Sequence, residues 1–227
     1  MTLEDHVRRY LELSGRADGL FSSVQKAHGD LMPCKPGCDE CCNVFFELTL
    51  IEAFVIGGIF RRSAPTNIRR HVNSRAEAVE PLFREARSML RAISETRPGS
   101  DSEIAEAAAK LRLACPMKED RKCVIYEYRP ITCRLYGTPQ DLGDRVVTCP
   151  RTGFKVGEPY TVVRVMEIND KLALYSRELL NDLIGCDLAA TSRLRYPMPA
   201  VVKTSFDKQY FLRLRQVFED SPNQTAE

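Results

Sequence analysis

The sequence predicts a mainly α-helical single domain built around a loop-rich core of cysteines. Apolar residues recur with helical spacing over three long stretches, 2–30, 49–113 and 160–184. Two other stretches, 34–42 and 115–150, are rich in cysteine, proline and glycine, which is typical of loops. With 227 residues, 44% of them hydrophobic, the chain can form one domain with a substantial core.

The first predicted helix covers residues 2–30. Gly15 and Gly19 interrupt its apolar pattern, and because glycine weakens a helix, we expect a break near them. The apolar residues that predict the helix are Val7, Tyr10, Leu11, Leu13, Leu20, Phe21 and Val24.

The stretch 49–113 is predicted to hold several helices in succession. The first begins at Thr49, because Thr49 and Glu52 fit a capping box, in which a hydroxyl and a carboxylate each accept a hydrogen bond from a free backbone N–H. Pro65 is expected to end this helix. A longer helix, or two, follows over residues 66–96.

A last strong helical pattern covers residues 160–184 and is expected to end at Gly185. Residues 201–218 carry a weaker pattern, and residues 221–227 have the polar composition of a disordered tail. We therefore expect one domain over residues 1–220, in which the helices fold back and bring the two cysteine stretches together.

Charge and composition bear on compartment and partners. The formal net charge is +2, which offers no basic excess for binding nucleic acid. The first residues include acids where a signal peptide has a basic start and an apolar run. The longest weakly polar stretch, 49–60, is far shorter than the roughly 20 residues that span a bilayer. We expect a cytoplasmic protein that binds no nucleic acid and no membrane and acts with an unknown protein partner or substrate.

Nine cysteines are the most informative residues of the chain. In a reducing compartment, clustered cysteines more often bind metal than form disulfides. The Cys-x2-Cys spacing of Cys38 and Cys41 lets two thiolates bind one metal across a tight turn, and Gly37 allows that turn. The first group of candidate ligands is Cys34, Cys38, Cys41 and Cys42.

A second group of cysteines lies in the late loop-rich stretch. Two of its members precede a proline, a step that also occurs at the last ligand of bacterial ferredoxin motifs. Because side chains of neighbouring residues diverge, Cys41 and Cys42 are not expected to bind the same ion, and Cys41 is the preferred ligand. Cys42 is then a ligand of a second centre, a redox-active thiol, or a residue that contacts the ligands without binding the metal. Cys186 is expected to be a plain thiol. The second group is Cys115, Cys123, Cys133 and Cys149.

Residues beside the second group are candidates to support the metal. Four thiolates leave a net charge of about −2 with Zn²⁺ or an oxidised four-iron cluster. Arg134 directly follows Cys133 and is the first candidate to compensate that charge. Tyr126 is a candidate to shield the cofactor from water, with ordinary packing as the alternative.

One string of residues is more specific than the cysteine spacing. Residues 123–134 read C-V-I-Y-E-Y-R-P-I-T-C-R, and they follow the early cysteine cluster and a Cys-Pro step. Together these motifs resemble the YkgJ-type CxxCxxCC family, described as zinc- or iron-chelating proteins. The resemblance covers residues 34–150 and implies metal chelation. One departure is the three residues, instead of two, between Cys34 and Cys38.

Three functions remain open at this stage. Eight clustered thiolates are more than one zinc ion needs, so we expect an iron–sulfur cluster, of the four-iron type, with a redox or accessory role. A zinc-stabilised interaction module is the alternative, since two four-cysteine zinc sites would use all eight. A metalloenzyme that modifies a protein or peptide side chain is the third, with its catalytic residues unknown.

Overall fold

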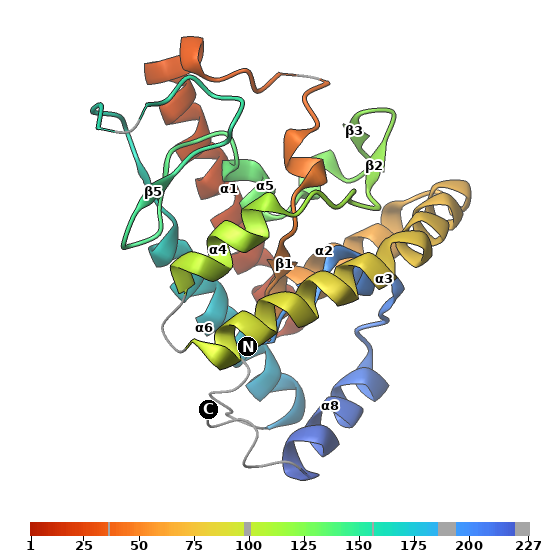
Figure 1. Ribbon diagram of the computed structural model, residues 1–227. Helices are drawn as coiled ribbons and strands as arrows, with labels where there is room; N and C mark the ends of the chain where they lie inside the picture. Colours follow the sequence, from red (N-terminus) through yellow and green to blue (C-terminus); the bar gives the residue numbers. More distant parts are fainter. Residues whose placement is uncertain (36, 98–100, 156, 186–193, 221–227) are drawn as a thin grey trace.

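The computed structural model describes residues 1–35, 37–97, 101–155, 157–185 and 194–220. Over these ranges the protein is mainly α-helical, with eight α-helices and a few two-residue strands, so the predicted fold class is confirmed (Figure 1). Cys186 and the predicted tail, 221–227, lie outside the described residues. None of the helices in these ranges is long and apolar enough to cross a bilayer.

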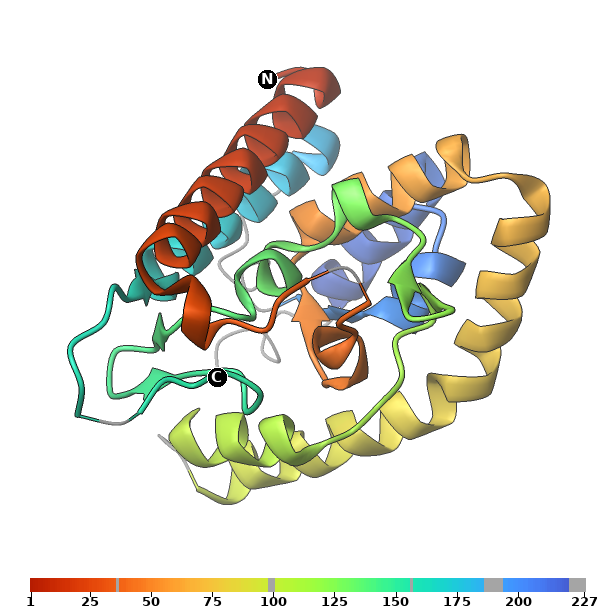
Figure 2. The same cartoon turned by 90° about the horizontal axis from the view of Figure 1, so that it is seen from above.

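Helix α1, Leu3–His28, lies beside α6, Val165–Ile184 (Figure 2). It runs unbroken through Gly15 and Gly19, so the predicted break is wrong. Both glycines lie on the exposed side, where a missing side chain leaves no gap in the packing. The buried stripe of the helix continues past them and holds it together; its apolar members are Tyr10, Leu13, Ala17 and Val24.

Helix α2, Leu50–Ser63, crosses the middle of the core, and much of its surface is buried. The predicted capping box is present, since the Glu52 carboxylate accepts hydrogen bonds from the backbone N–H and the hydroxyl of Thr49 at 3.1 and 3.0 Å. The helix contacts α1, α6 and the short α7, Met198–Lys203. It is therefore the element around which the other helices pack.

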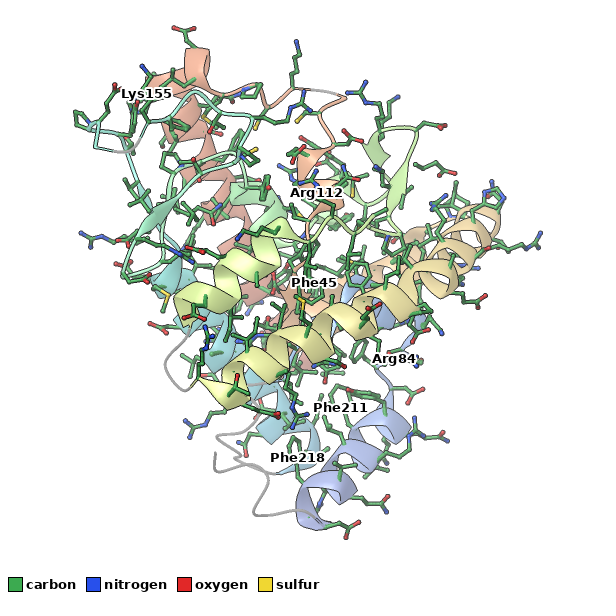
Figure 3. All side chains as sticks on the ribbon, in the orientation of Figure 1. Phe45, Arg84, Arg112, Lys155, Phe211 and Phe218 are labelled. Atoms are coloured by element: carbon green, nitrogen blue, oxygen red, sulfur yellow. The ribbon has the colours of Figure 1, made fainter. Side chains whose placement is uncertain are left out.

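Helix α3, Thr66–Thr96, curves along one edge of the molecule (Figure 2). Pro81 lies inside it and removes one backbone hydrogen bond, which is a common cause of helix bending. Helix α4, Asp101–Lys110, packs on its second half. A small apolar cluster fills this contact, in which the Phe45 and Phe83 rings lie 5.6 Å apart (Figure 3).

The late cysteine stretch has little regular structure, as predicted. It holds an antiparallel hairpin of β2, Lys118–Glu119, and β3, Lys122–Cys123, followed by a 3-10 turn and the short helix α5, Ile131–Leu135. A three-stranded sheet in the order β5-β4-β6 follows. Its strands are β4 Gln140–Asp141, β5 Val146–Val147 and β6 Val163–Arg164.

The C-terminal elements close the core. Helix α6 ends as predicted at Gly185, whose φ of 69° is the left-handed conformation that glycine adopts readily. Strand β7, Tyr196–Pro197, pairs antiparallel with β1, Glu47–Leu48, and leads into α7. Helix α8, Lys208–Asp220, packs on α6.

Candidate metal centre

The early and late cysteine stretches lie side by side in space, although helices α2 to α4 separate them along the chain (Figures 1 and 2). The backbone N–H of Cys115 donates to the carbonyl oxygen of Cys42 at 2.8 Å. Just beyond, Val44 and Arg112 form an isolated antiparallel bridge. The predicted convergence of the two stretches is therefore a feature of the backbone itself.

Polar side chains reinforce this contact. The Lys118 ammonium group lies 3.3 Å from the Asp39 carboxylate and 2.7 Å from the Asn43 amide oxygen. Arg112, labelled in Figure 3, pairs with Glu40 at 2.6 Å. Both acids belong to the early stretch, Lys118 belongs to the late one and Arg112 lies just before it, so both ion pairs help to connect the two.

The loop that carries Cys34 and Cys38 makes a second contact with the late stretch. Gly37 has a φ of 88°, and the Cys38 N–H donates to the Lys35 carbonyl at 2.9 Å, which closes a tight turn through the glycine. At the other side, the Gly153 N–H donates to the Leu31 carbonyl at 2.8 Å. This bond brings the Cys149 turn next to the start of the early loop.

One cavity of about 540 Å³ lies where these segments meet. All eight predicted ligand cysteines line it, from both the early and the late stretch, and all eight are free thiols. Phe21 from α1 and Met198 from α7 complete its apolar wall. The donor set is therefore soft sulfur at the edge of an apolar core, which is the chemistry that zinc and iron–sulfur clusters require.

Burial favours the neutral form of six of these thiols. Burial and the neighbouring Cys38 raise the pKa of the Cys34 thiol to about 11, and burial raises the pKa of Cys115 to about 12. Burial likewise raises the pKa of Cys123, Cys133 and Cys149. Several thiolates would therefore coexist here only if positive charge entered the cavity with them.

Cys41 and Cys42 both line the cavity, although neighbouring side chains were expected to diverge. A hydrogen bond between their side chains, together with burial, raises the pKa of Cys41 far above its ordinary value. The two residues lie in the 3-10 turn Glu40–Asn43. Successive side chains of a 3-10 turn are about 120° apart, so two of them can flank the same space.

Arg134 lines the cavity but is held by other partners. It is only 6% exposed, and its guanidinium donates to the Asp18 carboxylate, to the Arg129 carbonyl at 2.9 Å and to the Glu127 carbonyl. The charge of Arg129 opposes the rise in the pKa of Cys41 and Cys123. Arg151 and Arg75 have the same effect on Cys34 and Cys115. The sequence predicted Arg134 near the site, but its contact with Asp18 of α1 could not be predicted from its place after Cys133.

Tyr126 lies at the rim of the cavity and is 59% exposed. The Arg129 guanidinium stacks over its ring at 4.1 Å. The pair forms part of the boundary between the thiols and solvent, which is compatible with the predicted shielding role.

The ligand roles themselves stay a prediction. In the part of the chain that the structure describes, no three Cys, His, Asp or Glu side chains are arranged as ligands of a single ion. Comparisons with protein-family models, with curated proteins and with solved structures find no match to this chain.

Proposed function

We propose that this protein binds an iron–sulfur cluster, of the four-iron type, through cysteine thiolates and that it has a redox or accessory role. One observation supports the proposal above all others: eight cysteines from two distant stretches line one cavity. Scattered structural cysteines have no reason to share a cavity, whereas ligands of a common inorganic centre must do so.

The size of the cavity favours a cluster over a single ion. Its volume of about 540 Å³ is more than ten times the roughly 30 Å³ that one water molecule occupies in the liquid. A zinc ion needs four ligands at about 2.3 Å from one point, which draws the sulfurs into a far smaller space. A cluster spreads its thiolate ligands over several iron atoms and fills more of this volume.

The chain's own residues would hold and isolate such a cluster. Phe21 and Met198 limit the access of water from the core side, and Arg129 compensates thiolate charge at the rim. The cluster itself would supply the capacity to take up and release an electron. Since all eight described cysteines are free, we also propose a reducing compartment, the cytoplasm.

The similarity to the YkgJ-type family agrees with this proposal and stays a prediction based on the motifs at 34–42 and 115–134. A zinc-stabilised interaction module is the competing function, because the same thiols suit zinc.

Purification without oxygen tests the proposal. We expect a brown protein with visible absorbance, iron and acid-labile sulfide in equal amounts. A colourless protein that carries stoichiometric zinc and no sulfide would refute the iron–sulfur cluster and support the zinc-stabilised interaction module.

Substitution of single cysteines tests the ligand set. Cys38→Ser, Cys41→Ser and Cys133→Ser should each lose metal and make residues 115–150 sensitive to protease, because metal binding is coupled to local folding. Cys186→Ser is the matched control and should change neither property. Full metal content in Cys38→Ser would contradict the assignment.

A further inference from the structure

Six of the eight cysteines fall into two triads that are supported by different parts of the chain. We name Cys34, Cys38 and Cys149 the first triad. Its segments are joined by the hydrogen bond from the Gly153 N–H to the Leu31 carbonyl. Cys149 heads a tight turn, in which its carbonyl accepts from the Thr152 N–H at 3.0 Å and from the Thr152 hydroxyl at 2.6 Å.

Cys115, Cys123 and Cys133 form the second triad, which belongs to the hairpin and to α5. The Cys115 carbonyl accepts from the Lys118 N–H at 3.0 Å, and Lys118 pairs with Cys123 across β2 and β3. Cys133 lies on α5, whose first N–H, from Ile131, donates to the buried Glu52 carboxylate at 3.3 Å. Each triad thus has its own backbone support.

The remaining pair, Cys41 and Cys42, lies between the triads. The pair follows Cys38 of the first triad in the 3-10 turn Glu40–Asn43, and the Cys42 carbonyl accepts from the N–H of Cys115, a member of the second triad. If one thiolate of the pair joins each triad, two sets of four result. Four thiolates are the complete ligand set of a four-iron cluster, and also of a structural zinc ion.

We propose that the cavity holds two neighbouring metal centres, one on each triad, with Cys41 and Cys42 divided between them. This inference rests on the proposed function, because it requires that the thiols bind metal. It also explains why Cys41 and Cys42 are adjacent, because two ligands on successive residues would hold the two centres at a fixed and short separation. Electrons could then pass between the centres within one protein.

Counting metal in two double variants tests the inference. Cys34→Ser/Cys149→Ser removes two ligands of the first triad, and Cys115→Ser/Cys133→Ser removes two of the second. In protein purified without oxygen, we expect each double variant to keep about half of the metal and sulfide per chain of the unchanged protein. The combined quadruple variant should keep none.

Several outcomes would overturn it. If each double variant lost all metal while circular dichroism showed an unchanged helix content, the cavity would hold one shared centre. If a double variant lost helix content, the single variants Cys34→Ser and Cys123→Ser would replace it, with the same expected halves. If the unchanged protein contains iron and sulfide, electron paramagnetic resonance of the reduced protein provides an independent measure. Magnetic coupling in the unchanged protein that is absent from both double variants supports two centres. The absence of coupling from the fully reduced, unchanged protein contradicts them.

Failure of the inference differs from failure of the proposed function. An unchanged protein that holds no metal at all would refute the proposed function. If the metal were zinc, the same halves would still support two centres and would reject only the cluster.

Discussion

Gly137 leaves the space that the Cys34 sulfur occupies. A Cβ atom at position 137 would overlap Cys34 Sγ and would lie 3.4 Å from the Phe21 ring. The residue is buried on the cavity wall, two residues after the end of α5. The absence of a side chain at this point is therefore a requirement of the site and not of the local backbone.

Gly137→Ala is expected to displace the Cys34 thiol and to lower the metal content, while the helices remain. Metal analysis together with circular dichroism measures both effects. Gly15→Ala is the matched control. No atom lies within 4 Å of its added Cβ on exposed α1, so it should keep the metal and raise the free energy of unfolding by about 0.5–1 kcal/mol. An unchanged metal content in Gly137→Ala would show that Cys34 binds none.

Asp18 forms ion pairs with two arginines that line the cavity, Arg129 and Arg134. Its carboxylate accepts from buried Arg134 and lies 3.5 Å from Arg129. It connects α1 to the segment that carries Cys133. Because Asp18 is 44% exposed, solvent screens part of this interaction.

Asp18→Asn should lower the free energy of unfolding by about 1–2 kcal/mol, since it leaves the charge of buried Arg134 without its anion. Urea titration measures the change. Asp170→Asn, on the exposed side of α6, is the control and should stay within about 0.5 kcal/mol of the unchanged protein. Equal stability of the two variants would contradict the role given to Asp18.

At the residue scale, the sequence predicted the members of the site better than their supports. All eight cysteines that line the cavity were expected from clustering, and Arg134 was expected from its place after Cys133. Gly137 and Asp18 carry no sequence signal, because each matters only through a contact with a distant segment. The prediction that the Cys41 and Cys42 side chains diverge was wrong, because both residues lie in a 3-10 turn that the cysteine spacing does not reveal.

Among the elements, helices α2 and α5 share one buried carboxylate. Glu52 caps the start of α2 and also accepts the Ile131 N–H at the start of α5. The sequence revealed the first of these contacts through the capping box. The second joins residues 79 positions apart and could not be predicted from local pattern.

Burial of Glu52 makes stability depend on pH. Desolvation raises the pKa of this carboxyl group above its ordinary 4.5 in the folded state. The folded protein therefore binds the proton more tightly than the unfolded chain, so the contribution of Glu52 is complete below pH 4.5 and is lost as pH rises through the folded value. The free energy of unfolding, measured against Glu52→Gln, should fall as pH rises above 4.5. A flat difference would contradict the shift.

Helix existence was more predictable than helix continuity. The start of α2 after Thr49 and the end of α6 at Gly185 could be predicted, because helix caps are local interactions. Gly15 and Gly19 do not break α1, because packing of the opposite face on α2, α5 and α6 outweighs the loss of helix propensity.

At the scale of the whole molecule, the contact between the early and late stretches assembles the cavity. The Lys118 side chain contributes to this contact, since it bridges Asp39 and Asn43 from the opposite segment. The sequence predicted that the two stretches meet. The side-chain pairs that join them could not be predicted, because they depend on how helices α2 to α4 bring the late stretch back to the early one.

Lys118→Met should loosen this contact and weaken metal binding by about tenfold, as is typical when a residue that orients the ligands is lost. Competition with a chelator measures the affinity. Lys110→Met, on the exposed end of α4, is the control and should leave the affinity unchanged. Equal affinities in both variants would mean that the backbone bond from Cys115 to Cys42 is sufficient.

The cavity wall is built from an early and a late part of the chain, and this has a consequence for synthesis of the protein. Cys42 leaves the ribosome roughly 70 residues before Cys115, the first of the late cysteines, and this takes about 4–15 s at about 5–20 residues per second. During that interval the early thiols have no late partners to share a metal with. Loading of a complete centre is thus a step that follows translation of most of the chain, and the nascent early loop must be kept reduced until then.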